Sequence, residues 1–195
     1  YATNGGVYLT KSGADKRRMS PEELRRLFAE SGGLSAEEGL LTDSSLRDLD
    51  SESLQVFMRK RDLQVYEDLK SGRLDINTIC ENLDLVRSGV LTLAGNLLFG
   101  REPRRFSKSF YAQCVYFNGN DLGATSFLSK DNFYGTIPTL YQQALNFLRS
   151  NLRRPQISKA FNEQSELEIP EACLVEVLVN ALLHRDYFIN ATIKV

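Results

Sequence analysis

PEACLVEVLVNALLHRDY, residues 170–187, is the most informative stretch of this sequence. Proline is common in the first turn of a helix, and the run that follows predicts a helix from Pro170 to about His184. At about 100° per residue, Glu176, Asn180 and His184 fall within one narrow arc of that helix. Almost every other position is apolar. The stretch therefore predicts a mostly buried helix with one polar stripe.

Two interpretations of the stripe stay open at this point. A buried carboxylate or amide left without a partner costs on the order of 1–3 kcal/mol, so Glu176 and Asn180 need partners. They could face water or hydrogen-bond a neighbouring strand, as satisfied polar groups commonly do. Alternatively, they could face a bound ligand and its metal ion. The spacing does not choose between the two.

The residues before this stretch predict further helices and one strand. Apolar residues at helical spacing predict an amphipathic helix from Ile137 to Leu152. An aromatic, apolar run predicts a strand over Phe110–Phe117. Three more helices are expected over residues 54–69, over 76–83 with Asp75 as cap, and over 93–99 with Thr92 as cap and Gly100 after the end.

The first fifty residues predict a small strand-and-helix unit followed by a linker. Residues 7–10 favour a strand, and residues 11–13 a turn. Ser20, Pro21 and Glu23 form the pattern of a capping box at a helix start. Residues 31–53 are rich in Ser, Asp and Glu, which is typical of a linker.

Composition narrows the class of protein. The chain has 195 residues, 42% hydrophobic and 25% charged, which predicts one folded domain or two small ones. A net charge of -1 excludes a protein that is basic as a whole, although local basic patches remain compatible with it.

Cys80, Cys114 and Cys173 are far apart in the sequence, which argues against a disulfide framework or a zinc site and fits a reducing cytoplasm. We expect Cys173 to lie in the core. No apolar run reaches the roughly 18 residues of a membrane span.

Three segments carry a resemblance to a known family. EVLVNALLHRDY, residues 176–187, resembles the "E-a-l-v-N-A-l-x-H-R-D-Y" stretch of RecG-like, Schlafen-associated bacterial regulators. LTLAGNLLFGREP, residues 91–103, resembles the "L-T-x-A-G-x-L-L-F-G-x-x-P" signature of the same group. GGVYLTKSGA, residues 5–14, with SPEEL, residues 20–24, resembles the tail of the preceding Schlafen/AlbA-like domain, once described as a divergent AAA domain.

The resemblance implies a divergent GHKL (histidine-kinase-like) ATP-binding domain whose N-box lies in the last helix. It implies that Glu176 is the general base that polarises the attacking water. It implies that Asn180 coordinates Mg²⁺ bridging the phosphates of ATP, with His184 as a further candidate contact to the nucleotide. One helix face brings both side chains to one phosphate cluster at this spacing.

The same resemblance implies an internal piece of a longer transcriptional regulator related to the RecG helicase. The chain opens without methionine and ends on ATIKV, residues 191–195, which favours a strand. The glycine-rich motifs of GHKL proteins should lie beyond Val195, and no P-loop replaces them. We therefore expect the chain to be inactive alone. Whether the whole protein hydrolyses ATP stays open.

The expected fold class is α+β. Residues 1–48 are expected to form the tail of the Schlafen/AlbA-like domain (strand plus helix) and a linker. Residues 49–118 are expected to form a helical, winged-helix-like middle that ends in a strand. Residues 119–195 should contain a long helix and the first helix of a GHKL-type α/β sandwich.

Two other functions compete with nucleotide binding. The first is DNA binding by the winged-helix-like middle, which basic clusters favour. The candidate DNA contacts are Arg59, Lys60, Arg61, Arg104, Arg105, Arg153 and Arg154. The second is a homodimerisation or scaffold role, in which an apolar strand edge near Ile193 and Val195 pairs between chains.

Overall fold

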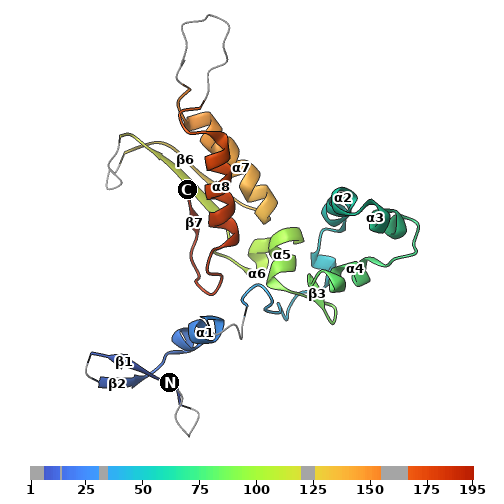
Figure 1. Ribbon diagram of the computed structural model, residues 1–195, viewed down its shortest axis with the longest axis horizontal. Helices are drawn as coiled ribbons and strands as arrows, with labels where there is room; N and C mark the ends of the chain where they lie inside the picture. The colour runs from blue at the N-terminus through green and yellow to red at the C-terminus, as the bar shows by residue number, and fades with distance from the viewer. Residues whose placement is uncertain (1–6, 14, 31–34, 120–125, 155–166) are drawn as a thin grey trace, which may run out of the picture.

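A computed structural model describes residues 7–13, 15–30, 35–119, 126–154 and 167–195 (Figure 1). The fold is α+β, as expected, with helices and three small sheets in these ranges. None of the described helices is both long and apolar enough to cross a membrane.

The N-terminal part is a hairpin followed by a helix. Strand β1 (Leu9–Ser12) pairs antiparallel with β2 (Asp15–Arg18), and α1 (Pro21–Glu30) follows. The predicted capping box is confirmed. The Ser20 amide donates to Glu23 Oε2 at 2.8 Å, and the Glu23 amide donates to Ser20 Oγ at 3.2 Å. The sequence did not predict β2, because its four residues are all charged and therefore show no apolar alternation.

A helical middle follows. Its elements are η1 (Leu46–Asp48), α2 (Ser51–Arg61), α3 (Leu63–Lys70), α4 (Ile76–Asn82), β3 (Val86–Arg87), β4 (Val90–Leu91), α5 (Leu93–Phe99) and α6 (Pro103–Phe106). The single helix predicted over residues 54–69 is wrong. Asp62 ends α2 and caps α3, because its carboxylate accepts from the Val65 amide at 3.1 Å. Leu54, Met58 and Ile79 lie in the buried core of this unit.

The polar stretch expected to be a linker instead packs onto the helical middle over residues 35–50. The Leu41 amide donates to the Leu91 carbonyl at 2.9 Å, and the Leu93 amide donates to the Gly39 carbonyl at 2.8 Å. Leu49 is only 2% exposed. These backbone bonds, together with the buried leucine side chains, explain how a sequence rich in Ser, Asp and Glu stays ordered.

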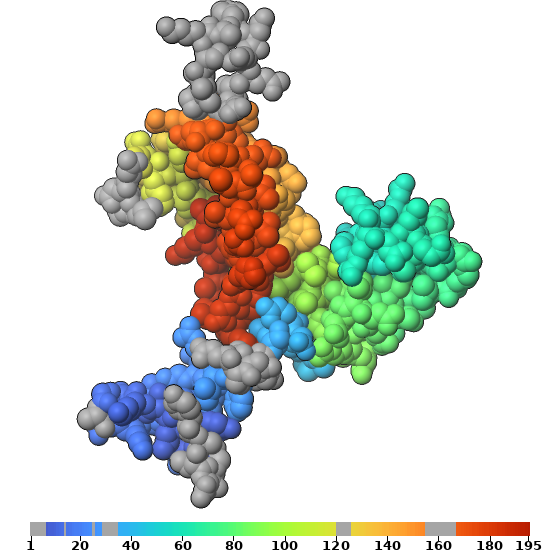
Figure 2. Space-filling view, in the orientation of Figure 1, coloured from blue at the N-terminus to red at the C-terminus, as the bar shows by residue number. Residues whose placement is uncertain are grey.

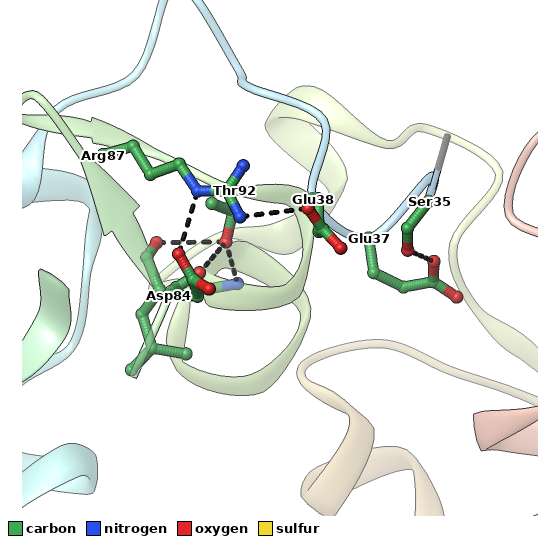
Figure 3. A network of polar contacts seen from close by, with 8 residues as sticks. Ser35, Glu37, Glu38, Asp84, Arg87 and Thr92 are labelled. Atoms are coloured by element: carbon green, nitrogen blue, oxygen red, sulfur yellow. Dashed lines mark hydrogen bonds and ion pairs between the residues drawn. The ribbon is translucent and has the colours of Figure 1, made fainter. Parts of the chain in front are cut away.

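A polar network reinforces this packing (Figure 3). The Arg87 guanidinium donates to Glu38 at 3.0 Å and to Asp84 at 2.9 Å, and so joins residues 49 positions apart. The guanidinium beside Asp84 holds the pKa of that carboxyl below its usual range. Within the segment itself, Ser35 Oγ donates to Glu37 at 2.6 Å.

Several residues of the family-like segment over residues 91–103 have a structural role. Thr92 is fully buried and accepts from the Gly95 amide at 3.0 Å, which confirms it as the cap of α5. A β-carbon on Gly95 would lie 2.1 Å from the Leu85 carbonyl oxygen, so only glycine allows this approach. Asn96 is buried and donates to the Pro103 carbonyl at 3.0 Å.

The C-terminal part is a three-stranded sheet with two helices on one face (Figure 1). Its strands β5 (Ala112–Phe117), β6 (Phe127–Phe133) and β7 (Ile193–Lys194) lie in the order β6-β5-β7. Strand β6 is antiparallel to β5, and β7 is parallel to it. Helices α7 (Ile137–Asn151) and α8 (Glu171–Leu183) confirm the two predicted helices.

The sheet crosses the domain boundary predicted at residue 118. Strand β5 lies before that boundary but pairs only with β6 and β7, which lie after it. Helix α5 joins the two parts, since Phe99 lies in the core of the helical middle and Leu97 in the core beneath the sheet. On the side of β7 that faces β5, the backbone hydrogen bonds are made within the chain, because the Val195 amide donates to the Gln113 carbonyl at 2.9 Å.

Candidate functional site

Helix α8 has one buried face and one open face. Leu174, Leu178 and Leu182 are buried against α7 and the sheet. On the open face Val177 is 66% exposed and Cys173 is exposed as well. Figure 2 shows the orange-red segment that contains α8 at the surface of the molecule. The predictions of a mostly buried helix and of a core Cys173 are therefore wrong. The helix carries apolar residues on all its faces, but the other described elements pack against only one of them.

Glu176 and Asn180 lie side by side on the open face. The Asn180 Nδ2 group donates to Glu176 Oε1 at 3.2 Å. A carboxylate can only accept, so the amide nitrogen must face it and the amide oxygen points elsewhere. Both residues are exposed. The stripe thus faces solvent, and it offers a carboxylate and a free amide oxygen from adjacent turns.

A pocket of about 350 Å³ opens where α8 ends. Asn180 and His184 line it from the helix, and Thr192 and Lys194 line it from the segment that leads into and forms β7. Glu176 lies one turn before Asn180 and is not a lining residue. The volume lies at the small end of the range of about 300–1,000 Å³ that is usual for ligand sites. The pocket can hold a small polar group such as part of a phosphate chain.

The metal expectation can be compared with the side chains present. Within the described ranges, no three His, Cys, Asp or Glu side chains come close enough to hold a metal ion. An ion at Asn180 would therefore need oxygen ligands from a bound phosphate or water. The free oxygen of Asn180 fits such a partial site, because Mg²⁺ prefers oxygen ligands and keeps several waters.

The residues just after α8 hold the chain in a tight return to the sheet. The Arg185 guanidinium donates to the carbonyls of Ile189, at 3.0 Å, and of Ala191. The Tyr187 hydroxyl donates to the Leu182 carbonyl at 2.6 Å. Burial lowers the pKa of Arg185 and raises the pKa of Tyr187. These two members of the family-like HRDY segment thus hold the return of the chain in place, and Arg185 also lines the pocket.

The predicted DNA contacts lie on three separate elements (Figure 1). They are Arg59, Lys60 and Arg61 in the last turn of α2, Arg104 and Arg105 in α6, and Arg153 and Arg154 after α7. Several carry local contacts already. Arg105 forms an ion pair with Asp48, and Arg104 lies 4.4 Å above the Tyr134 ring. The structure therefore does not gather these side chains into one basic surface.

Sequence reasoning missed the pocket wall formed by Thr192 and Lys194. Neither residue type nor spacing connects them to α8. They reach it only because β7 pairs in parallel with β5, where Gln113 lies opposite Lys194. A long-range strand pairing of this kind leaves no local signal in the sequence.

Comparison with known proteins gives a fold and no family. No family model matches the chain, and no curated protein matches it. Among solved structures, it is similar to the crystal structure of the DIP2311 protein from Corynebacterium diphtheriae, with a TM-score of 0.52 and 17% sequence identity. The match covers 97% of this chain and 35% of that protein. The chain thus shares its fold with about a third of a longer protein.

Proposed function

We propose that this chain contributes the Glu–Asn wall of a GHKL-type ATP site in a RecG-like, Schlafen-associated regulator. The observation that carries the proposal is the pair Glu176 and Asn180, exposed on one helix face and joined at 3.2 Å, beside a pocket that Asn180 lines. A surface pair of this kind has no packing role to account for it. We infer that the whole protein couples nucleotide binding to action on DNA, as a transcriptional regulator would.

The chemistry assigned to each side chain follows from its contacts. Mg-ATP, when bound, would supply the reactive phosphoryl group and the metal. Glu176 carries a carboxylate that can accept a proton from water, the role of a general base. Asn180 offers its amide oxygen as a metal ligand because its nitrogen already donates to Glu176. His184 lies on the pocket wall, where hydrogen bonding to phosphate oxygens is within its chemistry.

The proposal is tested by NMR with ¹⁵N-labelled chain and Mg-ATP. We expect weak, millimolar binding, because the described residues supply one wall only. Amide shifts should be confined to residues 176–184 and 191–194 and should require Mg²⁺. AMP, which lacks the β- and γ-phosphates, should produce smaller shifts.

Three variants sharpen this test. Asn180→Ala should abolish the shifts, whereas Glu176→Gln should preserve them, because the base is not needed for binding. Asn82→Ala removes the same group from an exposed position at the end of α4 and serves as the control. Absence of shifts in the unmodified chain, or equal shifts in Asn180→Ala, would refute the proposal.

A second candidate is duplex-DNA binding by the helical middle. Its support is the order of elements, since α2, α3 and α4 precede the β3–β4 hairpin as three helices precede a wing. The charges oppose it. Helix α4, which would enter the groove, carries Glu81 and no basic residue. Arg87 in the hairpin is paired with Asp84 and Glu38. We therefore rank it below nucleotide binding.

A further inference from the structure

The face of the β6-β5-β7 sheet that points away from α7 and α8 carries an unassigned surface. The pairing register puts opposite residues on the same face. Ala112 and Cys114 are buried on the helix side, so the alternate residues of β5 point to the other side. The residues of this open face are Tyr111, Gln113, Val115, Phe117, Phe127, Leu128, Lys130, Asn132, Tyr134 and Lys194.

None of these side chains is buried. Phe127 is 53% exposed and Tyr134 is 45% exposed. A bulge opposite Phe117 brings Phe127 to this face, and Lys130 Nζ lies 5.9 Å from the Phe127 ring centre. No described element covers this face, so its aromatic and aliphatic side chains are available to a partner.

The charges on this face are all positive. Lys130 and Lys194 are exposed, and Arg104 reaches over the Tyr111 and Tyr134 rings at 5.6 Å and 4.4 Å. No acidic residue appears among those that the register places here. The partner should therefore be anionic and should carry flat groups that stack on aromatic rings.

The centre of the face supplies hydrogen-bonding groups. Gln113 Nε2 donates to Asn132 Oδ1 at 3.1 Å, which leaves the Gln113 oxygen and the Asn132 nitrogen for another partner. These amides lie between the Tyr111–Tyr134 pair and the Phe127 end, along a strand about 20 Å long at roughly 3.3 Å per residue. Aromatic rings, cations and amides on an open sheet are the combination that binds single-stranded nucleic acids.

We propose that this open sheet face binds single-stranded nucleic acid, with bases stacked on its aromatic rings and phosphates on Lys130, Lys194 and Arg104. Arg104 in α6 is the one residue of the helical middle that takes part in this proposed face. Lys194 also borders the α8 pocket, whereas Phe127 and Lys130 do not line it, so variants of Phe127 and Lys130 test this proposal separately from the ATP site.

Fluorescence anisotropy with a labelled oligodeoxythymidine tests the proposal, with an oligouridine of equal length and a DNA duplex alongside. We expect single strands of either sugar to bind at low salt and the duplex to bind at least tenfold more weakly. Phe127→Ala should weaken binding by roughly five- to hundredfold, the range for loss of one base–aromatic stack. Lys130→Ala should reduce the slope of log K against log salt by about 0.7.

Matched controls separate this face from general charge attraction. Lys60→Ala removes one exposed charge from α2, and Asn180→Ala removes a polar group from α8; neither should change binding. The proposal is overturned if single strands do not bind, if Lys60→Ala weakens binding as much as Lys130→Ala, or if heparin, which has no bases, competes as well as an unlabelled single strand.

Discussion

Replacing Gly95 by alanine tests the close approach of α5 to the backbone at Leu85. A methyl group at Gly95 would lie 2.1 Å from the Leu85 carbonyl oxygen and 2.9 Å from its carbonyl carbon. Both are backbone atoms, so no side-chain rotation relieves the clash. Ordinary van der Waals contacts of a β-carbon lie at 3.4–4 Å, so relieving the 2.1 Å contact to oxygen requires α5 to move by more than about 1 Å from the chain between α4 and β3.

The magnitude comes from three opposing effects. Alanine is favoured over glycine in a helix by about 0.8–1.0 kcal/mol, which stabilises the variant. Overpacking costs about 1–3 kcal/mol. Movement of α5 also breaks the bond from the Gly95 amide to Thr92 Oγ1, and loss of a cap costs about 1 kcal/mol. We expect a net loss of about 2 kcal/mol, which lowers Tm by about 4–8 °C for a chain of this size.

Urea unfolding followed by circular dichroism, together with thermal melts, measures this loss. Ala94→Gly on the same helix is the control, because it changes propensity by about 1 kcal/mol without a clash. In Gly95→Ala, the Leu93 amide should also lose protection from hydrogen exchange, since its bond to Gly39 depends on the position of α5. A Gly95→Ala variant that is as stable as the unmodified chain, or more stable, would refute the reasoning.

Two further predictions concern ionisable groups. At pH 8 a thiol reagent should label Cys173 quickly and leave Cys80 and Cys114 unreacted until unfolding, because burial raises the pKa of each buried thiol to about 11; labelling of all three at one rate would contradict this. The Arg17 guanidinium, with the Ser20 amide, lowers the pKa of Glu23 to about 2. The folded pKa lies below the unfolded one, so the stabilisation of α1 is present above about pH 4.3 and is lost as pH falls toward 2. A carboxyl titration by NMR should show this low midpoint, and a midpoint near 4.3 would contradict it.

The elements that sequence predicted well are those with local signals. The capping residues Ser20, Asp75 and Thr92 each accept a hydrogen bond from an amide two or three residues later, as expected. Such bonds need only neighbours in the chain. The long helix α7 was equally clear, because its apolar stripe spans four turns.

The elements that sequence missed depend on long-range contacts. Strand β6 has a mostly exposed, polar sequence and contains a bulge, so it shows no alternation. Its strand conformation comes from pairing with β5. The open face of α8 was missed for a related reason: Val177 is as apolar as a core residue, and only the absence of a described neighbour leaves it exposed. The residue types predict which side chains could be buried, whereas the tertiary arrangement decides which of them are buried.

The candidate site shows the same division between local and long-range causes. Spacing alone placed Glu176 and Asn180 on one face, and the structure brings them into contact. In contrast, the family-like residues Gly95 and Arg185 have clear structural reasons: one permits a close backbone approach, and the other holds the turn after α8. A fold of this kind can therefore keep those residues whether or not it binds a nucleotide. Glu176 and Asn180 have no such reason, because they are exposed and bond only to each other among the described residues. The case for chemistry rests on this pair alone.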